Sequence, residues 1–300
     1  MEKKVTFREL LSQGQIFAPC VYDCLSARAA DLCGYKALMM SGGAVAYSMD
    51  GQPDMGFASL DEIVWVTERI TNVSPWPLIV DMDDGYGESP AVVYRNVKRL
   101  IKAGCMGLTL DDSTGIRGVE RWIGKGRKEW GLVSTEEWLA KIDAALEAAA
   151  GTDCVVIARS ERRINTEDGF KDAVDRGLRA KELGAEMVML GTRTTADGYR
   201  VAKYIKGWKM WPDVGSTKGV PNANLEEIDK LGYNFVTMHL FEKAALYGMM
   251  KFGMLNEANG SSVASDLDDM VGHPELAEQM QIIGNYKKWA ELEKRAHQGA

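Results

Sequence analysis

Acidic residues occur in three short segments whose composition suits metal binding or acid–base chemistry. One is the run DMDDGYG at 81–87, another is the pair Asp111 and Asp112, and the third contains Asp54. The chain has only three histidines and no Cys/His set with zinc-like spacing, so carboxylate oxygens are the available ligands. Oxygen ligands of this kind suit Mg²⁺ or Mn²⁺. Helix capping or a solvated loop explains any one of these aspartates, so the inference depends on the set.

Two further segments could bind an anion. Ser41, Gly42 and Gly43 are small residues that let backbone N–H groups approach an anion closely. Arg159 could bind a carboxylate through two parallel hydrogen bonds, and we expect it to serve ligand binding more than fold stability. The arginines at 162 and 163 are equally well explained by salt bridges at the surface or between subunits.

The elements that must position these residues alternate regularly. Apolar runs of strand length alternate with amphipathic segments, which indicates repeated βα units around a parallel sheet. The predicted strands are 16–22, 36–41, 77–82, 107–111, 154–160, 187–191, 209–213 and 234–239. The predicted helices are 25–33, 60–71, 91–103, 135–150, 168–183, 196–206, 225–231 and 241–252. Eight such units predict an α/β fold, a single (β/α)8 TIM barrel, with its active site at the carboxyl ends of the strands.

The repeating pattern ends near residue 255. We therefore expect a (β/α)8 barrel domain at 1–255 and a C-terminal helical extension at 256–300. A Gly/Asn/Ser-rich stretch around 260–262 precedes an acidic segment and a last amphipathic helix at about 274–295. Appended helices of this kind commonly cover a neighbouring subunit, so the extension is expected to form an oligomer contact.

Composition excludes several classes of partner. The formal charge is −7, and no Lys/Arg run is long enough to follow a phosphate backbone, so nucleic acid is not expected as a partner. The apolar stretches are too short to span a membrane, and the first ten residues lack the apolar region of a signal peptide. The five cysteines do not indicate a disulfide framework. These features predict a cytoplasmic enzyme.

Taken in order, the motifs resemble those of the isocitrate lyase/phosphoenolpyruvate mutase superfamily over roughly residues 5–255. The stretch at 81–87 has the form D-x-D-x-G-[YF]-G, which is specific when S-G-G precedes it and A-R follows it, as at 41–43 and 158–159. Supporting segments are VYDCLSA at 21–27, QPDMG at 52–56, KAG at 102–104 and DD at 111–112.

The resemblance implies a barrel that assembles as a homotetramer, a dimer of dimers with helices exchanged between subunits. It also implies a small carboxylate substrate held by Mg²⁺. The residues expected around the metal, directly or through water, are Asp81, Asp83 and Asp111. Those expected at the substrate are Ser41, Gly42, Gly43, Asp54, Arg159 and Asp213.

The chain also departs from the superfamily pattern. Lyases of this superfamily carry K-[KR]-C-G-H in the loop after the fourth strand, whereas residues 115–122 read GIRGVERW and contain no cysteine. Isocitrate lyase itself is therefore disfavoured, and the group that handles the proton is open. Glu120 and Arg121 are the catalytic candidates beside Arg159, and Lys125, Tyr47 and Tyr86 are further ones. We expect the glycine-rich segment 113–131 to form a lid.

The expected function is a Mg²⁺-dependent lyase that breaks a carbon–carbon bond in a small 2-hydroxy or 2-oxo di- or tricarboxylic acid. The bond would break by retro-aldol cleavage or decarboxylation, through an enolate held by the metal and Arg159. One alternative is a phosphonomutase or other C–P bond enzyme of the superfamily. The other is a non-catalytic barrel used for binding or assembly, although clustered acids repel one another when no cation is bound. The sequence leaves the substrate undetermined.

Overall fold

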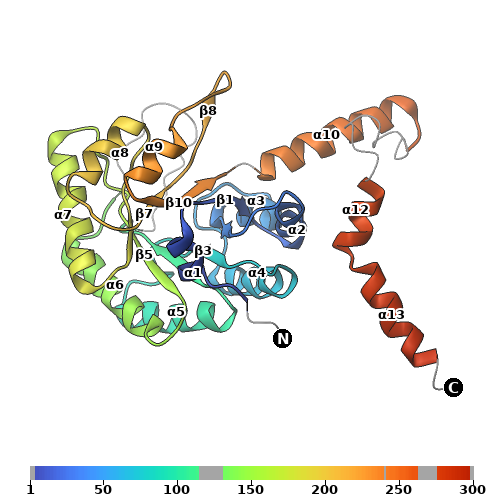
Figure 1. The fold of residues 1–300 in the computed structure, drawn as a ribbon, viewed down its shortest axis with the longest axis horizontal. Helices are drawn as coiled ribbons and strands as arrows, with labels where there is room; N and C mark the ends of the chain where they lie inside the picture. The colour runs from blue at the N-terminus through green and yellow to red at the C-terminus, as the bar shows by residue number, and fades with distance from the viewer. Residues whose placement is uncertain (1–3, 115–130, 240, 263–275, 298–300) are drawn as a thin grey trace. The chain divides into compact units, whose positions relative to one another are not determined.

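A computed structural model describes residues 4–114, 131–239, 241–262 and 276–297. Eight parallel strands close into a barrel in the order β1-β10-β7-β6-β5-β4-β3-β2, and helices surround it (Figure 1). The predicted (β/α)8 barrel is therefore confirmed. Its strands are β1 Ile16–Val21, β2 Leu38–Met40, β3 Leu78–Asp81, β4 Gly107–Leu110, β5 Val155–Arg159, β6 Met187–Met189, β7 Lys209–Trp211 and β10 Tyr233–Met238.

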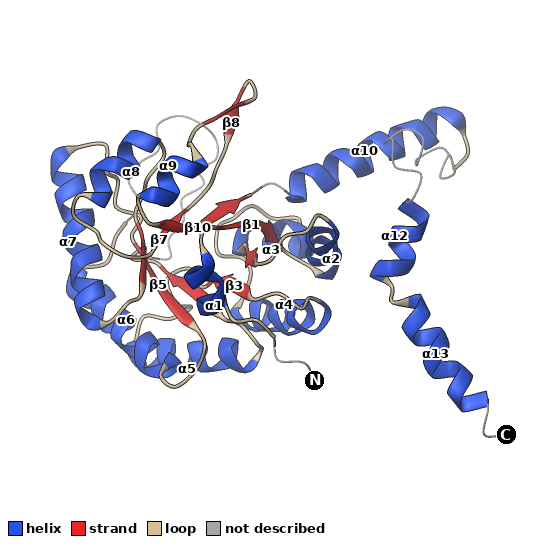
Figure 2. Cartoon of the chain, viewed as in Figure 1, coloured by secondary structure: helices blue, strands red, loops and turns tan. Residues whose placement is uncertain are grey.

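The helices between the strands also match the predicted segments (Figure 2). They are α2 Cys24–Leu32, α4 Leu60–Val73, α5 Pro90–Lys102, α6 Thr135–Ala149, α7 Glu167–Leu183, α8 Thr195–Ala202 and α9 Leu225–Lys230. Several begin at a side-chain cap: Ser134 accepts a hydrogen bond from the backbone of Glu137, and Thr166 accepts one from Gly169.

Two helices and a two-stranded hairpin were not anticipated from the sequence. Helix α1 is Phe7–Gln13, helix α3 is Gly42–Asp50, and strands β8 Ser216–Thr217 and β9 Val220–Pro221 form an antiparallel hairpin. Helix α1 packs Phe7 against Phe235 of β10, with ring centroids 4.9 Å apart. Phe7 and Leu11 of this helix belong to the apolar cluster that fills the barrel interior.

Side chains alternate between the two faces of each strand. One apolar cluster fills the barrel and includes Ala18, Cys20, Met39, Ile79, Ile157, Met189 and Phe235. A second cluster lies between the strands and the helices and includes Leu38, Val80, Leu108, Val156, Val188 and Trp138. We call the carboxyl end of the barrel, where β3 ends at Asp81, β5 at Arg159 and β10 at Met238, the mouth. Inward-facing residues at the last position of a strand project there.

The chain divides into two compact units, Met1–Phe241 and Glu242–Ala300. Helix α10 is Phe241–Asn259, so the predicted boundary after residue 255 falls inside it. The prediction of one last helix at about 274–295 is corrected to two helices, α12 Leu276–Ile283 and α13 Tyr286–His297. Asn285 between them has a φ of 54°, a left-handed conformation that interrupts a helix. In the part of the chain that the structure describes, no helix has the length and apolar character needed to cross a membrane.

Candidate active site

Asp81 and Arg159 meet at the mouth across strands β3, β4 and β5. The register pairs Asp81 with Thr109 and Leu110 with Ala158, so these strand ends lie side by side. Oδ1 of Asp81 accepts hydrogen bonds from Oγ1 of Thr109 and from Nη1 of Arg159, both at 2.9 Å. The structure therefore brings one predicted metal-binding residue into direct contact with the predicted substrate-binding arginine.

Arg159 is at the centre of the acidic group. Its Nε donates to Oε1 of Glu161 at 2.6 Å, and only 14% of its side chain is exposed. Burial opposes the charge of the guanidinium, but Glu161, Asp81, Asp111 and Asp83 together raise the pKa of Arg159 well above its ordinary value. The three aspartates predicted to surround a metal thus all lie near this one guanidinium. Glu161 was not singled out from the sequence, although it is two residues beyond the strand-end arginine.

Asp83 is buried and lies in the loop after β3 with a φ of 48°, the left-handed region that non-glycine residues rarely occupy. The hydroxyl of Tyr86 donates to its Oδ2 at 3.4 Å, and its carbonyl accepts from the backbone N–H of Asp111 at 2.7 Å. Oδ1 of Asp111 in turn accepts from the backbone and the hydroxyl of Ser113, at 3.0 and 2.7 Å. These bonds fix the loops that carry Asp83 and Asp111 against each other.

The two glycines after β2 allow helix α3 to begin close to carboxylates. A Cβ on Gly42 would lie 3.6 Å from Oδ2 of Asp83, and a Cβ on Gly43 would lie only 2.8 Å from Cβ of Asp54. Ser41 caps the helix by accepting from Ala44. The N-terminus of a helix has a partial positive charge, which favours the nearby carboxylates. The two glycines thus lie next to the chain's own acids, and their approach to a bound anion stays a prediction.

The carboxylate oxygens at the mouth could bind a cation, but the described residues do not form a complete set of direct metal ligands. Across 4–114, 131–239, 241–262 and 276–297, no three His, Cys, Asp or Glu side chains lie close enough together to ligate one ion directly. Asp81 and Asp111 each have one carboxylate oxygen that accepts hydrogen bonds within the protein. This arrangement fits Mg²⁺, which usually keeps several waters and binds few protein ligands directly. Metal binding by Asp81, Asp83 and Asp111 stays a prediction.

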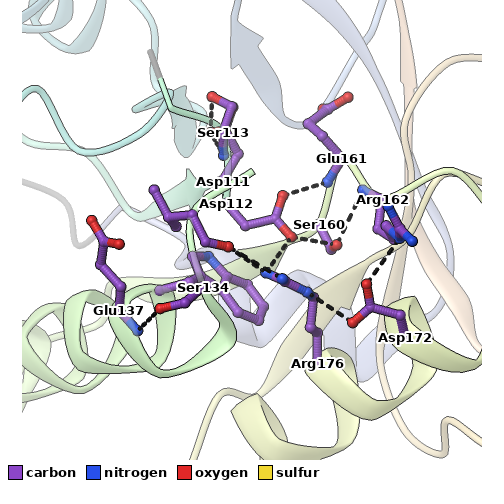
Figure 3. Close-up of polar contacts among 12 residues, drawn as sticks. Asp111, Asp112, Ser113, Ser134, Glu137, Ser160, Glu161, Arg162, Asp172 and Arg176 are labelled. Atoms are coloured by element: carbon purple, nitrogen blue, oxygen red, sulfur yellow. Dashed lines mark hydrogen bonds and ion pairs between the residues drawn. The ribbon is translucent and has the colours of Figure 1, made fainter. Parts of the chain in front are cut away.

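Asp112 has a different role from Asp111, and Figure 3 shows its contacts. It is fully buried, and its Oδ2 accepts from the Ser160 hydroxyl at 2.6 Å and from Nη1 of Arg176 at 3.2 Å. Its Oδ1 accepts from the backbone N–H of Glu161 at 2.8 Å. Burial raises the pKa of Asp112, while these donors oppose the increase. Asp112 therefore fixes the loop that follows Arg159 instead of facing the mouth.

Arg176, on α7, extends this network to the chain that returns after the predicted lid. Its Nη1 and Nη2 both donate to the carbonyl of Val133 at 3.2 Å, and its Nε donates to Asp172 at 3.2 Å (Figure 3). Arg162 forms an ion pair with the same Asp172 at 2.8 Å. Arg162 is thus a structural ion-pair residue, one of the two interpretations that the sequence left open.

Asp213 and His239 form a pair on the opposite side of the mouth. Oδ1 of Asp213, which follows β7, lies 3.3 Å from both Nδ1 and the backbone N of His239, which follows β10. Partial burial raises the pKa of Asp213, but the hydrogen bonds from His239 lower it overall. His239 also lies near Cys20 of β1, and the two groups affect each other's pKa. His239 was not singled out from the sequence, although it is the last residue of the predicted strand 234–239.

The candidate catalytic residues Glu120 and Arg121, with Lys125 and most of the predicted lid, lie outside the described residues. Tyr47 lies on α3 with an exposed side chain, whereas Tyr86 contacts Asp83.

Comparisons with known proteins agree with the fold and with the superfamily resemblance. The family model described as phosphoenolpyruvate phosphomutase matches residues 7–252. Among characterised relatives, 2,3-dimethylmalate lyase of Eubacterium barkeri is 29% identical over 295 residues, covering 93% of this chain and 94% of that protein. Oxaloacetate decarboxylase of Pseudomonas paraeruginosa (strain DSM 24068 / PA7) is 30% identical over 293 residues, covering 96% and 95%.

A solved structure has the same fold. The trigonal crystal form of 2,3-dimethylmalate lyase, described as a PEP mutase/isocitrate lyase superfamily member, superposes with a TM-score of 0.80 and 26% identity. The match covers 96% of this chain and 93% of that one.

Proposed function

Because the chain belongs to the phosphoenolpyruvate phosphomutase family, within the PEP mutase/isocitrate lyase superfamily, we propose that it is a carbon–carbon lyase. Its substrate is a small 2-oxo or 2-hydroxy di- or tricarboxylic acid. The observation that carries the proposal is Arg159, a partly buried guanidinium at the mouth with Asp81, Asp83 and Asp111 near it. The relatives named above act on acids of this class, and the retro-aldol and decarboxylation routes both produce an enolate.

Arg159 binds the substrate carboxylate and stabilises the negative charge that develops on the enolate. Its contacts with Asp81 and Glu161 involve all three guanidinium nitrogens, but each Nη carries two N–H donors and uses one of them in these contacts. N–H groups therefore remain for a substrate oxygen. The two carboxylates hold the guanidinium plane in place before the substrate arrives, so little reorganisation is needed when charge develops.

A divalent cation, Mg²⁺ or Mn²⁺, fits the oxygen donors of this site. Asp81, Asp83 and Asp111 would hold it, directly or through water. When bound, the ion supplies Lewis-acid stabilisation to the substrate carboxylate and to the adjacent oxygen. Ser41, Gly42 and Gly43 would offer backbone N–H groups to the substrate at the start of α3, with Asp54 beside them.

The experiment that tests this function is a substrate panel followed by proton NMR. The panel holds oxaloacetate, 2,3-dimethylmalate and, for the mutase alternative, a 2-oxo phosphonate, each with Mg²⁺ and with a chelator. We expect cleavage of at least one carboxylic acid, dependent on Mg²⁺ and lost in Asp83→Ala. Rearrangement of the phosphonate alone would instead assign the mutase activity. Oxalate binding with no turnover of any compound would assign a binding protein.

We also propose that the chain forms a homotetramer in which the tail helices cover neighbouring subunits. Support comes from α10, which has no buried residue and exposes Tyr247, Met249 and Met254. The barrel has an exposed apolar surface of its own, with Leu25, Tyr47, Met49, Phe57 and Trp65. Light scattering on the full chain should give about four times 33.1 kDa, and a mass of 33.1 kDa would contradict the assembly. The cytoplasmic location stays a prediction.

A further inference from the structure

The loop after β3, residues 82–87, has an unusual backbone conformation. Asp83, Gly85 and Tyr86 have φ values of 48°, 98° and 54°. Asp83 and Tyr86 are thus left-handed residues with side chains, which persist only where the surrounding structure holds them. A Cβ on Gly85 would lie 2.7 Å from a methyl group of Val93, so this position also lacks room for a side chain. The conformation therefore depends on hydrogen bonds from outside the loop.

Each of the four carbonyls of residues 83–86 accepts a hydrogen bond from another part of the chain. The first accepts from the backbone N–H of Asp111 at 2.7 Å, and the second accepts from Nζ of Lys141 at 3.2 Å. Nδ2 of Asn96 donates to the third and the fourth, at 2.9 and 3.3 Å. Two side chains therefore bind three consecutive carbonyls of the loop.

These two side-chain donors are buried and come from neighbouring helices. Asn96, on α5, is fully buried, and Lys141, on α6, is 3% exposed. The helices α5 and α6 pack against each other around the barrel (Figure 1). Helix α6 also holds the next strand end, because Nε1 of Trp138 donates to the carbonyl of Leu110, the last residue of β4, at 3.2 Å. The two helices thus hold the chain that follows β3 and the end of β4.

The backbone of the loop sets the direction of the Asp83 carboxylate. The N–H of Asp83 donates to Oδ1 of Asp81 at 3.3 Å, and its carbonyl is held by Asp111. A return of Asp83 to an ordinary negative φ would rotate its side chain about the N–Cα bond, away from its present position beside Tyr86. Like charges on Asp81 and Asp111 favour such a release when no cation is bound. Hydrogen bonds to the carbonyls that follow Asp83 oppose it.

We propose that Asn96 is a positioning residue of the cation site, and that Lys141 is a second residue that holds the same loop. The inference deepens the proposed function and rests on its cation site. Asn96 gives the sharper test, because it is uncharged. Its replacement by an apolar residue removes two hydrogen bonds from the loop and no charge, whereas replacement of Lys141 also changes the charge near the acidic residues.

The first measurement needs no metal. Three N–H groups of the loop, those of Asp83, Gly85 and Tyr86, donate hydrogen bonds within the protein, so they should be protected from deuterium exchange. Mass spectrometry follows their exchange with a chelator present. Asn96→Leu should speed it by roughly tenfold, because each of two lost hydrogen bonds shifts the opening equilibrium by a few-fold. Lys141→Met should speed it by a smaller factor, because it removes one bond.

The second measurement is the affinity for Mg²⁺, by calorimetry. Asn96→Leu should bind Mg²⁺ about fivefold or more weakly, because the binding-competent loop is then less populated before the ion arrives. Asn96→Ser, whose side chain is too short to reach both carbonyls, should change exchange and affinity in the same direction. It keeps the test available if the leucine variant does not fold.

The matched control is Val97→Ala. Val97 is the next residue on α5, and it is fully buried in the apolar cluster between the strands and the helices. The variant loses packing but no hydrogen bond to the loop, so it should unfold at a lower urea concentration. Its loop exchange and its Mg²⁺ affinity should stay within about twofold of wild type.

Three results would overturn the inference. One is loop exchange in the Asn96 variants within about twofold of wild type. Another is faster exchange with unchanged Mg²⁺ affinity, which would make Asn96 a structural residue only. The third is an equal loss of Mg²⁺ affinity in Val97→Ala, which would show that any destabilisation of α5 has this effect.

Failure of this inference is distinguishable from failure of the proposed function. A wild-type chain that binds Mg²⁺ and cleaves no acid of the panel, while Asn96→Leu binds the ion more weakly, would refute the lyase function and support the role of Asn96. A chain that cleaves an acid while both Asn96 variants bind Mg²⁺ normally would do the reverse. A wild-type chain that binds no divalent cation would refute the role of Asn96, whatever it cleaves.

Discussion

Replacing Asp112 with asparagine perturbs the fixed framework behind the site without replacing any side chain that faces the mouth. In the wild type, one carboxylate oxygen accepts from Ser160 and Arg176, and the other accepts from the backbone of Glu161. Asparagine is nearly isosteric, but its NH₂ group would face donors on one side. It would also leave Arg176, only 8% exposed, without its fully buried counter-charge.

The expected cost follows from burial. Breaking a buried ion pair by removing one partner costs about 3–5 kcal/mol. Arg176 keeps Asp172 and the Val133 carbonyl, so we expect a loss of about 2–4 kcal/mol in the free energy of unfolding. That corresponds to a fall in Tm of roughly 5–12 °C. Because Glu161 positions Arg159, oxalate affinity should also fall, by roughly tenfold.

Urea and thermal unfolding followed by circular dichroism measure the loss in the free energy of unfolding and in Tm. Calorimetry measures the affinity for oxalate. The matched control is Asp172→Asn, which removes the other carboxylate from Arg176 at a position that is 35% exposed. Solvent screens that pair, so the control should cost about 1 kcal/mol or less. Equal losses for the two variants would refute the reasoning that burial makes Asp112 the anchor.

Other predictions concern the mouth. Asp83→Ala should weaken Mg²⁺ binding measured by calorimetry at least tenfold, and an unchanged affinity would show that the cation binds elsewhere. Arg159→Lys keeps the positive charge but loses the planar guanidinium that contacts Asp81 and Glu161, so oxalate affinity should fall about tenfold to a hundredfold. Unchanged oxalate affinity together with a lower free energy of unfolding would instead make Arg159 a purely structural residue. Because the pKa of His239 is raised in the folded state, protonation of this residue stabilises the fold. This contribution to the free energy of unfolding is complete below about pH 6.5 and is lost as the pH rises through the folded-state pKa. Urea unfolding should therefore show that wild type exceeds His239→Gln in free energy of unfolding by about 1 kcal/mol or less at low pH, and that this difference declines above about pH 6.5. A difference that grew with pH would contradict a raised pKa of His239.

The sequence was sufficient for the barrel because its strands are short apolar runs bounded by polar residues. Asp81 and Arg159 were identified for the same reason, since each lies within one residue of the end of such a run and is the last residue of the observed strand. The difference between Asp111 and Asp112 follows from strand alternation, which sends neighbouring side chains to opposite faces. The motif alone treated the pair as one acidic group.

Other features depend on contacts between distant segments. Helix α3 begins directly after Ser41, and only the approach of Asp54 to Gly43 shows why glycine is needed there. His239 and Asp213 are 26 residues apart and meet because β7 and β10 are neighbours in the barrel. Nothing in either residue's local pattern indicates the other. The break at Asn285 arises from a left-handed backbone conformation that helical periodicity does not reveal.

The measurement that tests the lyase function most directly is the fate of carbon-13 placed at C4 of oxaloacetate. Mg²⁺ alone decarboxylates this acid slowly, so a metal-only sample and a sample with Asp83→Ala run beside the wild type. Carbon-bond cleavage at the mouth predicts labelled CO₂ or a labelled cleavage fragment at a rate well above both controls, and loss of that excess on chelation. Rates equal to the metal-only sample, for oxaloacetate and for 2,3-dimethylmalate alike, would contradict the assignment of this chain as a carbon–carbon lyase.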